Sequence, residues 1–482
     1  MAQEQGPQRK GEMMKVWCFI LLLSWFTLQL DANPGLKVRI TQKGLDFGKE
    51  IGMEILKERI KEESFPDWND SEKFGLSEIN YLLSGIRIDT IEFRNTAISL
   101  IPGTGIKLTI ENAYVIIKAN WNIRSWMFKG SGRTTVVISG LSITAMLVMS
   151  MDSTGHPSIS LDSCQMIASG VEVKLHGKNS WFYNMFTKFL KKSIHRILDS
   201  NSCPNLRQEI EIIDMELRIL QILMQIDDFA QIDYSLVKSP AVFQSYIDLD
   251  LQGTTYPVGN YPAHPYVPVP FALQDSSDSM LYLAVSEYSF QTTVFAYYTT
   301  GAFNIIITDE VCSYFNITTE TFGSIIPEVA QYYAESQPVM LNLTATKTPV
   351  ISLQTDAFTI EIHGSMEVLA VLPDATTQSL FTVNITTNSS INLTLFDQKL
   401  IGSLCLNRFQ LSLADSNLGF FEISLLENFF SYILHSEIIP SANAKLTKGF
   451  PLPNLANISL KKPFIKVEQG YLWISADVNY EQ

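Results

Sequence analysis

The chain has 482 residues, of which 46% are apolar and only 17% are charged, and its formal net charge is −14 at pH 7. This length predicts two or more domains, because a single hydrophobic core rarely serves so many residues. The composition argues against a nucleic-acid partner, because no stretch combines a basic stripe with interleaved aromatic residues.

The charge is divided unevenly along the chain. Residues 31–240 contain 24 Lys and Arg against 25 Asp and Glu, whereas residues 241–482 contain 8 against 22. If any part of the protein approaches an anionic surface, we therefore expect it to be the first half.

The first 32 residues have the pattern of a leader sequence. An apolar run, Val16–Leu28, follows Lys15 and precedes a small residue, Ala32. The run is too short to span a bilayer and is typical of a secretory signal. We expect cleavage near residue 32 and a secreted, extracellular protein; an uncleaved anchor is the alternative, and Met13 or Met14 could be the true start.

Secretion agrees with the presence of N-glycosylation sequons, which predict a glycoprotein. They start at Asn69, Asn316, Asn342, Asn384, Asn388, Asn392 and Asn457. Asn384, Asn388 and Asn392 alternate with apolar residues, so we expect them to decorate one exposed face of a sheet.

After the leader, the pattern predicts a short strand over residues 36–41 and a helix over about residues 44–63. Phe47, Ile51 and Ile55 share a face of this helix with Gly48 and Gly52. Each glycine costs about 1 kcal/mol relative to alanine inside a helix. Either a ligand approaches this face closely, or the helix packs tightly on a sheet with nothing between them.

Residues 79–175 alternate between apolar and polar residues and contain glycine-rich turns, which predicts an antiparallel meander. The hairpin over residues 120–130 carries three large aromatic side chains and two cations: Trp121, Trp126, Phe128, Arg124 and Lys129. These aromatic side chains either cover the end of a domain or enter a lipid interface, where Trp is favoured.

An amphipathic helix is predicted over residues 181–198, and a second helical stretch over about residues 205–225. The apolar face of the first comprises Phe182, Phe186, Phe189, Leu190, Ile194 and Ile197. Cysteines lie at both ends of this region, and the pairing of Cys164 with Cys203 is favoured because it ties the helix end to the preceding strand. Cys312 and Cys405 either pair or remain as buried thiols, and we favour the thiols.

A proline-rich stretch at residues 256–270 reads as an extended linker that divides the chain. The second half repeats the pattern of the first: a strand at 302–308, a helix at 322–334, strands over 339–413, and an amphipathic helix at 423–435 that is broken at Pro440. We expect a duplicated fold, with domains at 33–240 and 276–482 and a connecting segment at 241–275.

Signatures of catalysis are absent from the sequence. It contains no G-x-S-x-G elbow, no H-E-x-x-H motif, no Walker loop and no paired cysteines at zinc spacing, and its six histidines are scattered. We therefore predict no enzymatic activity, no catalytic residues and no metal site.

Five segments, in order, resemble the bactericidal/permeability-increasing and lipopolysaccharide-binding proteins. They are Pro34–Thr41 with Gly44–Gly48, the Cys164 and Cys203 positions where that family places its single disulfide, the proline-rich linker, Phe322–Ala330, and Lys448–Pro453. The resemblance covers nearly the whole mature chain. It implies an α+β fold: an elongated boomerang of two similar antiparallel barrels with helices, joined by a central sheet.

The resemblance also implies a function, since relatives bind endotoxin or transfer phospholipid and cholesteryl ester. We expect a monomeric lipid-binding protein of innate immunity that holds phospholipid acyl chains in two apolar pockets, and that binds lipopolysaccharide or touches a membrane surface transiently. No cofactor is expected besides the bound phospholipid. The expected pocket lining is Phe47, Ile51, Ile55, Phe182, Phe186, Phe189, Leu190, Ile325, Val329, Leu426 and Phe430.

The hairpin at 120–130 departs from the endotoxin binders, whose equivalent tip is rich in Lys and Arg. Here only Arg124 and Lys129 remain among the aromatic residues. We therefore expect a weakened clamp for lipid phosphates without potent bactericidal action, and a membrane-touching tip that draws neutral phospholipid. The alternative is an innate-immune or receptor interaction module that carries no lipid.

Overall fold

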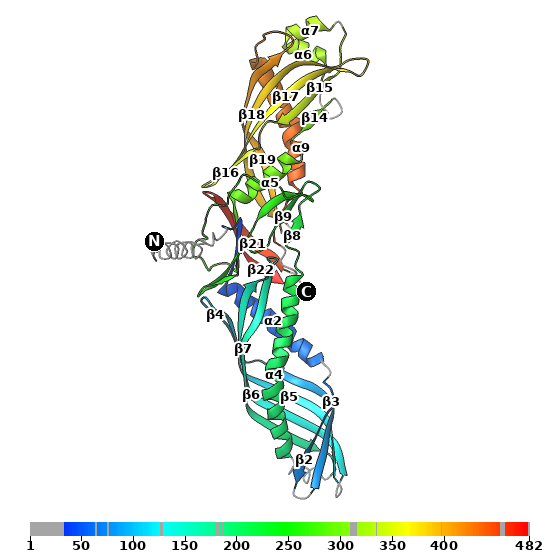
Figure 1. Cartoon of the computed structure of the whole chain (residues 1–482), viewed down its shortest axis with the longest axis vertical. Helices are drawn as coiled ribbons and strands as arrows, with labels where there is room; N and C mark the ends of the chain where they lie inside the picture. Colours follow the sequence, from blue (N-terminus) through cyan, green and yellow to red (C-terminus); the bar gives the residue numbers. More distant parts are fainter. Residues whose placement is uncertain are drawn as a thin grey trace, which may run out of the picture.

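The computed structural model describes residues 33–62, 65–74, 77–125, 129–178, 184, 187–308, 316–333, 335–396, 398–453 and 458–480. The molecule is elongated, with one curled sheet at each end and a smaller sheet across the middle (Figure 1). The sheet at one end is formed by strands of the first half of the chain, and the sheet at the other end by strands of the second half. This is the two-barrel α+β architecture that the family resemblance implied.

The central sheet is antiparallel and combines strands from both ends of the chain. Its strands are, in spatial order, β10 (Ala241–Val242), β11 (Tyr246–Leu251), β1 (Leu36–Thr41), β13 (Leu281–Ser286), β22 (Tyr471–Tyr480) and β21 (Ile458–Glu468). Arg39 of β1 is only 4% exposed and donates to both carboxylate oxygens of Asp248, at 2.7 and 2.9 Å. Such a bidentate pair fixes the register of β1 against β11.

The N-terminal sheet consists of long antiparallel strands whose alternating residues point to opposite faces. Its strands are β2 (Trp68–Phe74), β3 (Ser77–Glu92), β5 (Gly105–Arg124), β6 (Lys129–Met151) and β7 (Pro157–His176), and β4 (Asn95–Ile101) pairs with β5. The inner face of this sheet forms a core that includes Trp121, Val136 and Val173.

The C-terminal sheet repeats this arrangement. Its strands are β14 (Ile305–Ile307), β15 (Val339–Ala345), β17 (Ala357–Val371), β18 (Thr377–Phe396), β19 (Lys399–Ser416) and β20 (Phe450–Pro451), and β16 (Val350–Gln354) pairs with β17. A small sheet of β12 (Thr254–Pro257), β9 (Ala230–Asp233) and β8 (Leu223–Gln225) lies beside the junction.

Helices accompany each curled sheet. In the N-terminal half they are α2 (Gln42–Glu62) and α4 (Thr187–Arg218). In the C-terminal half they are α5 (Glu287–Thr299), α6 (Thr319–Ile325), α7 (Pro327–Tyr332), α8 (Ser424–Ile433), a π-helical turn (Leu434–Ile438) and α9 (Ile439–Leu446). Helices α2 and α4 run along the N-terminal sheet (Figure 1).

The structure corrects the prediction of two helices at 181–198 and 205–225. Helix α4 continues through Pro204, although proline removes one backbone donor. Cys203 is held by a disulfide one residue earlier, and packing of Leu206 and Ile210 against β6 and β7 stabilises the helix on the far side of the proline. Tertiary contacts therefore outweigh the local preference for a break.

Two helix predictions in the second half were also wrong in their limits. The helix predicted at 322–334 is divided at Pro327 into α6 and α7, with Ile326 in an extended conformation between them. The helix predicted to break at Pro440 instead continues as the π-helical turn and α9, where Pro440 occupies the first turn and needs no intrahelical donor.

Helix α5 was not predicted at all. It follows β13 without a gap, just as α2 follows β1, so α5 and not the 322–334 segment is the counterpart of α2. Its sequence is rich in Thr, Tyr and other residues that favour strands. The side chain of Ser286 caps the helix by accepting from the N–H of Ser289, and contacts with the rest of the fold supply the remaining stability.

Candidate functional site

Helix α2 has an apolar side that lies outside the hydrophobic cores. None of its 21 residues is buried, although Met53 and Ile60 pack against the core of the N-terminal sheet. Phe47, Ile51 and Ile55 lie at a spacing of four residues on another side of the helix, and Ile55 is 39% exposed. An apolar helix surface of this kind can accept an apolar ligand.

The two glycines on this helix have room around them. A Cβ atom added to Gly48 or Gly52 would meet no heavy atom within 4 Å. Of the two interpretations that the sequence left open, tight packing of the helix on the sheet is therefore wrong at these positions.

Four of the predicted lining residues belong instead to packed protein cores. Leu190 is 2% exposed among strand residues of the N-terminal sheet, while Val329, Leu426 and Phe430 are 0–3% exposed in a phenylalanine-rich core with Phe322. Their side chains are fully used in packing, so their assignment to a pocket wall was wrong.

The remaining predicted lining residues are less uniform. Phe189 and Ile325 are partly buried and pack against these same cores. Phe182 and Phe186 lie outside the residues that the structure describes.

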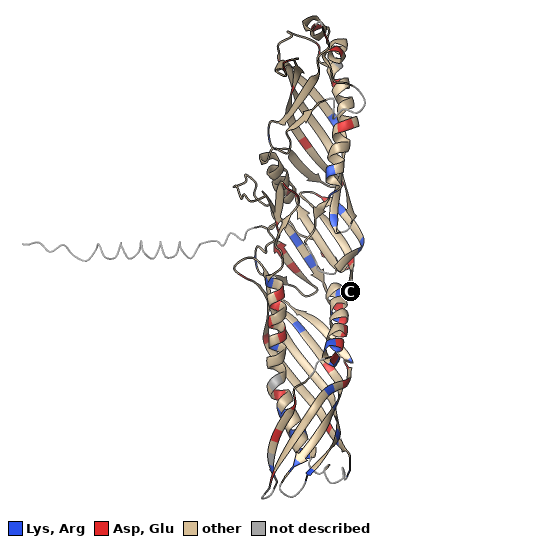
Figure 2. Ribbon diagram, turned by 90° about the vertical axis from the view of Figure 1, so that its right-hand side faces the viewer, with Lys and Arg blue, Asp and Glu red and all other residues tan. Residues whose placement is uncertain are grey.

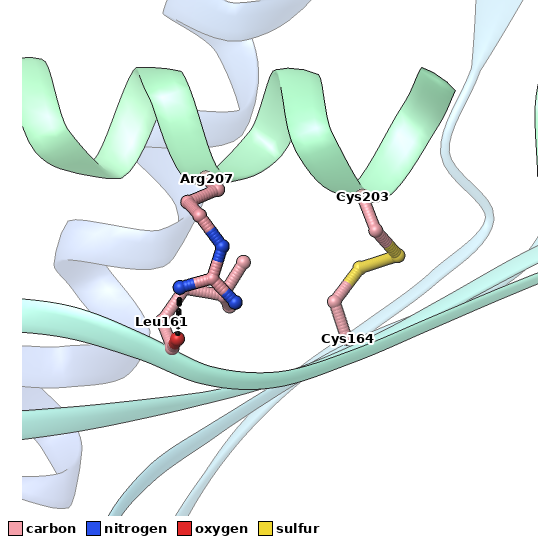
Figure 3. Close-up of a disulfide and its surroundings, with 4 residues drawn as sticks. All are labelled: Leu161, Cys164, Cys203 and Arg207. Carbon is pink, nitrogen blue, oxygen red and sulfur yellow. Dashed lines mark hydrogen bonds between the residues drawn. A yellow bond between two sulfur atoms is a disulfide. The ribbon is translucent and has the colours of Figure 1, made fainter. Parts of the chain in front are cut away.

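Helix α4 is fastened to the N-terminal sheet by a covalent bond and a hydrogen bond (Figure 3). Cys164 of β7 and Cys203 of α4 form the predicted disulfide, and Arg207, one turn further along the helix, donates to the carbonyl oxygen of Leu161 at 2.9 Å. The helix is therefore fixed near its middle to the strand on which it lies.

Asp214 provides a second attachment nearer the end of α4. Its Oδ1 accepts from the Ser158 hydroxyl at 2.6 Å and from the N–H of Ile159 at 2.8 Å, while Arg218 donates to its Oδ2. Burial alone would raise the pKa of Asp214, but these hydrogen bonds and the Arg218 charge outweigh it and lower the pKa.

The predicted membrane tip is only partly placed by the structure. Trp121 is 2% exposed, and its indole N–H donates to the carbonyl oxygen of His176 at 3.1 Å, so it is a core residue and its assignment to a membrane tip was wrong. Trp126 and Phe128 lie outside the described residues. Arg124 and Lys129 are exposed and form the last residue pair between β5 and β6.

The fold adds further cations to this end of the molecule. Arg133 of β6 and Lys174 of β7 are exposed on the same outer face as Arg124, and the first two turns of α4 contribute Lys188 and Lys192. We call Arg124, Lys129, Arg133, Lys174, Lys188 and Lys192 the basic tip. The sequence prediction considered only one hairpin and so did not include four of these cations, although the run Lys188, Lys191 and Lys192 indicated further positive charge nearby in the sequence.

Charged residues are scarcer in the C-terminal half. Figure 2 shows Lys, Arg, Asp and Glu along both helices and at the far end of the N-terminal half, whereas most of the C-terminal sheet is uncharged. The basic tip therefore lies at the more highly charged end of the molecule.

Cys405 has an exposed, free thiol, so the prediction of a buried thiol was wrong; Cys312 lies outside the described residues.

Most of the predicted glycosylation sites are accessible. Of the sequon asparagines, Asn69, Asn316, Asn384 and Asn392 are exposed, Asn342 and Asn388 are half-buried, and Asn457 is not described. No group of His, Cys, Asp or Glu able to hold a metal occurs within the described ranges. None of the helices described here combines the length and apolarity needed to cross a bilayer.

Known proteins similar to this chain match nearly its whole length. A human BPI fold-containing family C protein is 35% identical over 96% of this chain and 92% of the relative, and a bactericidal permeability-increasing protein from Sebastes schlegelii is 32% identical over 97% and 100%. Human lipopolysaccharide-binding protein is 27% identical over 95% and 96%. A crystal structure of lipopolysaccharide binding protein superposes with a TM-score of 0.65 at 25% identity, covering 94% of this chain and all of the other.

The family domains match in the same order as the two halves of the fold. The N-terminal domain of the LBP / BPI / CETP family matches residues 44–214, and its C-terminal domain matches residues 224–480. The chain therefore belongs to the LBP / BPI / CETP family.

Proposed function

We propose that this protein is a secreted lipid carrier that holds phospholipid acyl chains against the apolar side of α2. The observation that carries the proposal is a 21-residue helix without a buried residue whose Phe47, Ile51 and Ile55 contribute to no hydrophobic core of the described residues. Membership in a family with lipopolysaccharide-binding relatives supports it. Covering this apolar surface with acyl chains contributes roughly 0.8 kcal/mol per buried CH₂ group, which retains a two-chain lipid without a covalent bond.

The test is extraction of the protein purified from the medium of secreting cells, followed by mass spectrometry of the organic phase. The expected result is an acyl lipid in molar proportion to the protein. A protein that yields no lipid, yet folds and binds a protein partner, would support the interaction module instead.

We further propose that the basic tip brings the N-terminal half to anionic lipid surfaces, including the phosphates of lipopolysaccharide. Six exposed cations lie on β5, β6, β7 and α4 at one end of the molecule, and the acidic second half of the chain forms the opposite end. Each Lys or Arg near an anionic surface contributes roughly 1 kcal/mol at physiological salt. The half of the chain that approaches the membrane is then the half that carries α2.

Replacing Arg124, Lys129 and Arg133 together by Ser should weaken sedimentation with phosphatidylglycerol-containing vesicles by tenfold or more. The effect should shrink as salt increases, because exposed charges are screened. The matched control replaces Lys399, Lys445 and Lys448, three exposed lysines of the C-terminal half, by Ser. Equal losses for both triple variants would contradict a specific role for the tip.

A further inference from the structure

Strand β14 is the outermost strand of the C-terminal sheet and has an apolar outer surface. All three of its residues are isoleucine, and among the strands that the structure describes it pairs only with β15. Ile307 is 1% exposed and points into the C-terminal core, whereas Ile306, on the opposite face, is 58% exposed. An edge strand without charge or proline can pair with a strand of another molecule, so such strands are normally covered or interrupted.

Other outward side chains beside Ile306 are apolar as well. Ile306 pairs directly with Asn342 of β15, while Met340, two residues earlier on β15, pairs with Leu369 of β17. Residues two apart on a strand point to the same face, so Met340 and Leu369 share the outer face with Ile306, and both are half-buried. We call Ile306, Met340 and Leu369 the edge patch. Asn342 therefore lies among the three apolar side chains of this patch.

Asn342 is the first residue of a sequon that Thr344 completes. Both side chains lie on the outer face of β15, and Thr344 is exposed. Directly opposed residues on neighbouring antiparallel strands have Cβ atoms about 4.5–5.5 Å apart, and diagonal neighbours are about 7–8 Å apart. A sugar ring joined to the side-chain amide of Asn342 is therefore within contact distance of Ile306.

Two other sequons of the same sheet have polar surroundings. On β18, Asn384 lies between Ser365 of β17 and Ser412 of β19, and Asn392 lies opposite Ser403 of β19. A glycan at either position therefore meets no apolar side chain directly across from it. Asn342 differs from both, because the side chain opposite it on the edge strand is a largely exposed isoleucine.

We propose that an N-linked glycan on Asn342 covers the edge patch and keeps β14 from pairing with a second copy of the chain. The apolar face of its first N-acetylglucosamine lies against Ile306. The side-chain nitrogen of Asn342 forms a bond to C1 of this sugar and loses a proton, while the bond from C1 to the diphosphate of a lipid-linked oligosaccharide breaks and the diphosphate leaves with its lipid. The inference depends on the proposed secretion but not on lipid carriage, so a lipid-free protein would leave it intact.

Mass spectrometry of glycopeptides from the full chain, secreted by cultured cells, measures the occupancy of each sequon. The expected result is a glycan on Asn342 in nearly every molecule. An unmodified Asn342 beside modified Asn384 and Asn392 would overturn the inference and leave the predicted glycoprotein intact, whereas a chain unmodified at every sequon would contradict both.

Two variants of β15 remove the same glycan by different substitutions. Asn342→Gln and Thr344→Ala should each raise the fraction of chains that sediment as dimers or larger species by about threefold or more, because the edge strand is then uncovered. The matched controls, Asn384→Gln and Asn392→Gln, also lose one glycan each and should sediment like the wild type. Association of both β15 variants and of neither β18 variant supports the inference, and any other pattern overturns it.

A rescue variant tests whether the isoleucine is the surface that the glycan covers. Ile306→Thr removes exposed apolar area but keeps a β-branched residue suited to a strand, so adding it to Asn342→Gln should restore the sedimentation of the wild type. Persistent association would place the role of the glycan elsewhere and refute the inference. Should Asn342→Gln alone not be secreted, secretion of the double variant supports the inference and its retention in the cell contradicts it.

Discussion

Single side chains decide how the elements of the N-terminal half are joined. Asp214 links three groups, the Ser158 hydroxyl, the Ile159 amide and Arg218, and so connects the end of α4 to the start of β7. Its side chain is 14% exposed. Hydrogen bonds to a carboxylate at such a site are stronger than those between neutral groups, and an amide in its place loses the charge and the second acceptor oxygen that Arg218 uses.

Asp214→Asn should therefore lower the free energy of unfolding by about 1–3 kcal/mol at pH 7. Because the pKa of Asp214 is lowered in the folded protein, its contribution is fully present above the ordinary Asp pKa of about 3.9 and disappears as the pH falls through the lower folded value. Denaturant unfolding at pH 7 and below pH 4 measures this: the difference between wild type and variant should shrink in acid.

Asp162→Asn, an exposed position on the same strand β7, is the control and should change stability by less than about 0.5 kcal/mol. A variant of Asp214 as stable as wild type at pH 7 would show that the attachment contributes nothing.

Sequence alternation predicted the strands around Trp121 but not the direction of its side chain. On a strand, neighbouring residues point to opposite faces, so Trp121 and Ile123 face the core while Arg124 faces solvent. The hairpin allowed two explanations, and for Trp121 the pairing with Gly132, which leaves space for the indole beside His176, selects the core position.

At the scale of elements, the long strands and the helices α2 and α4 were predictable because their apolar residues recur with the right period. Helix α5 was not, because its apolar and polar residues surround the helix and its buried face consists partly of Ser and Thr. The continuity of α4 through Pro204 could not be predicted from the sequence either, because it depends on a disulfide and on packing against strands distant in the sequence.

The disulfide should be a large contributor to the stability of α4. Its two cysteines are separated by 39 residues, and closing a loop of that size stabilises by about 4 kcal/mol in the chain-entropy model. Replacing Cys164 and Cys203 together by Ser should lower the midpoint of denaturant unfolding accordingly and increase proteolysis of α4.

Cys405→Ser is the matched control, because this thiol is exposed and free. It should leave the unfolding midpoint unchanged. A loss of stability for Cys405→Ser comparable to that of the double variant would contradict the special role of the Cys164–Cys203 bond.

For the molecule as a whole, the two halves differ in surface as well as in packing. The N-terminal half ends in the basic tip, whereas residues 241–482 carry 8 basic against 22 acidic residues and most of the sequons. Three sequons lie along β18, where Asn384 and Asn392 are exposed on the outer face between inward-facing apolar neighbours. The outer face of the C-terminal sheet is therefore suited to glycans and not to a membrane.

Enzymatic removal of N-glycans from the secreted protein should lower its mass by several glycan units. Asn384→Gln combined with Asn392→Gln should remove two of these units, while the exposed Asn479→Gln, which is not part of a sequon, should remove none. An unmodified secreted protein would contradict this assignment.

The position of β1 has a consequence for biosynthesis. Strand β1, the first strand that the structure describes, lies between β11 and β13, and β13 in turn pairs with β22, which ends at Tyr480. A ribosome must therefore finish almost the entire polypeptide before the middle of the molecule can assemble, and pairings so distant along the chain form slowly. During that interval the open edges and apolar inner face of β1 are prone to wrong partners. We expect the nascent protein to depend on chaperones until its last strand has emerged.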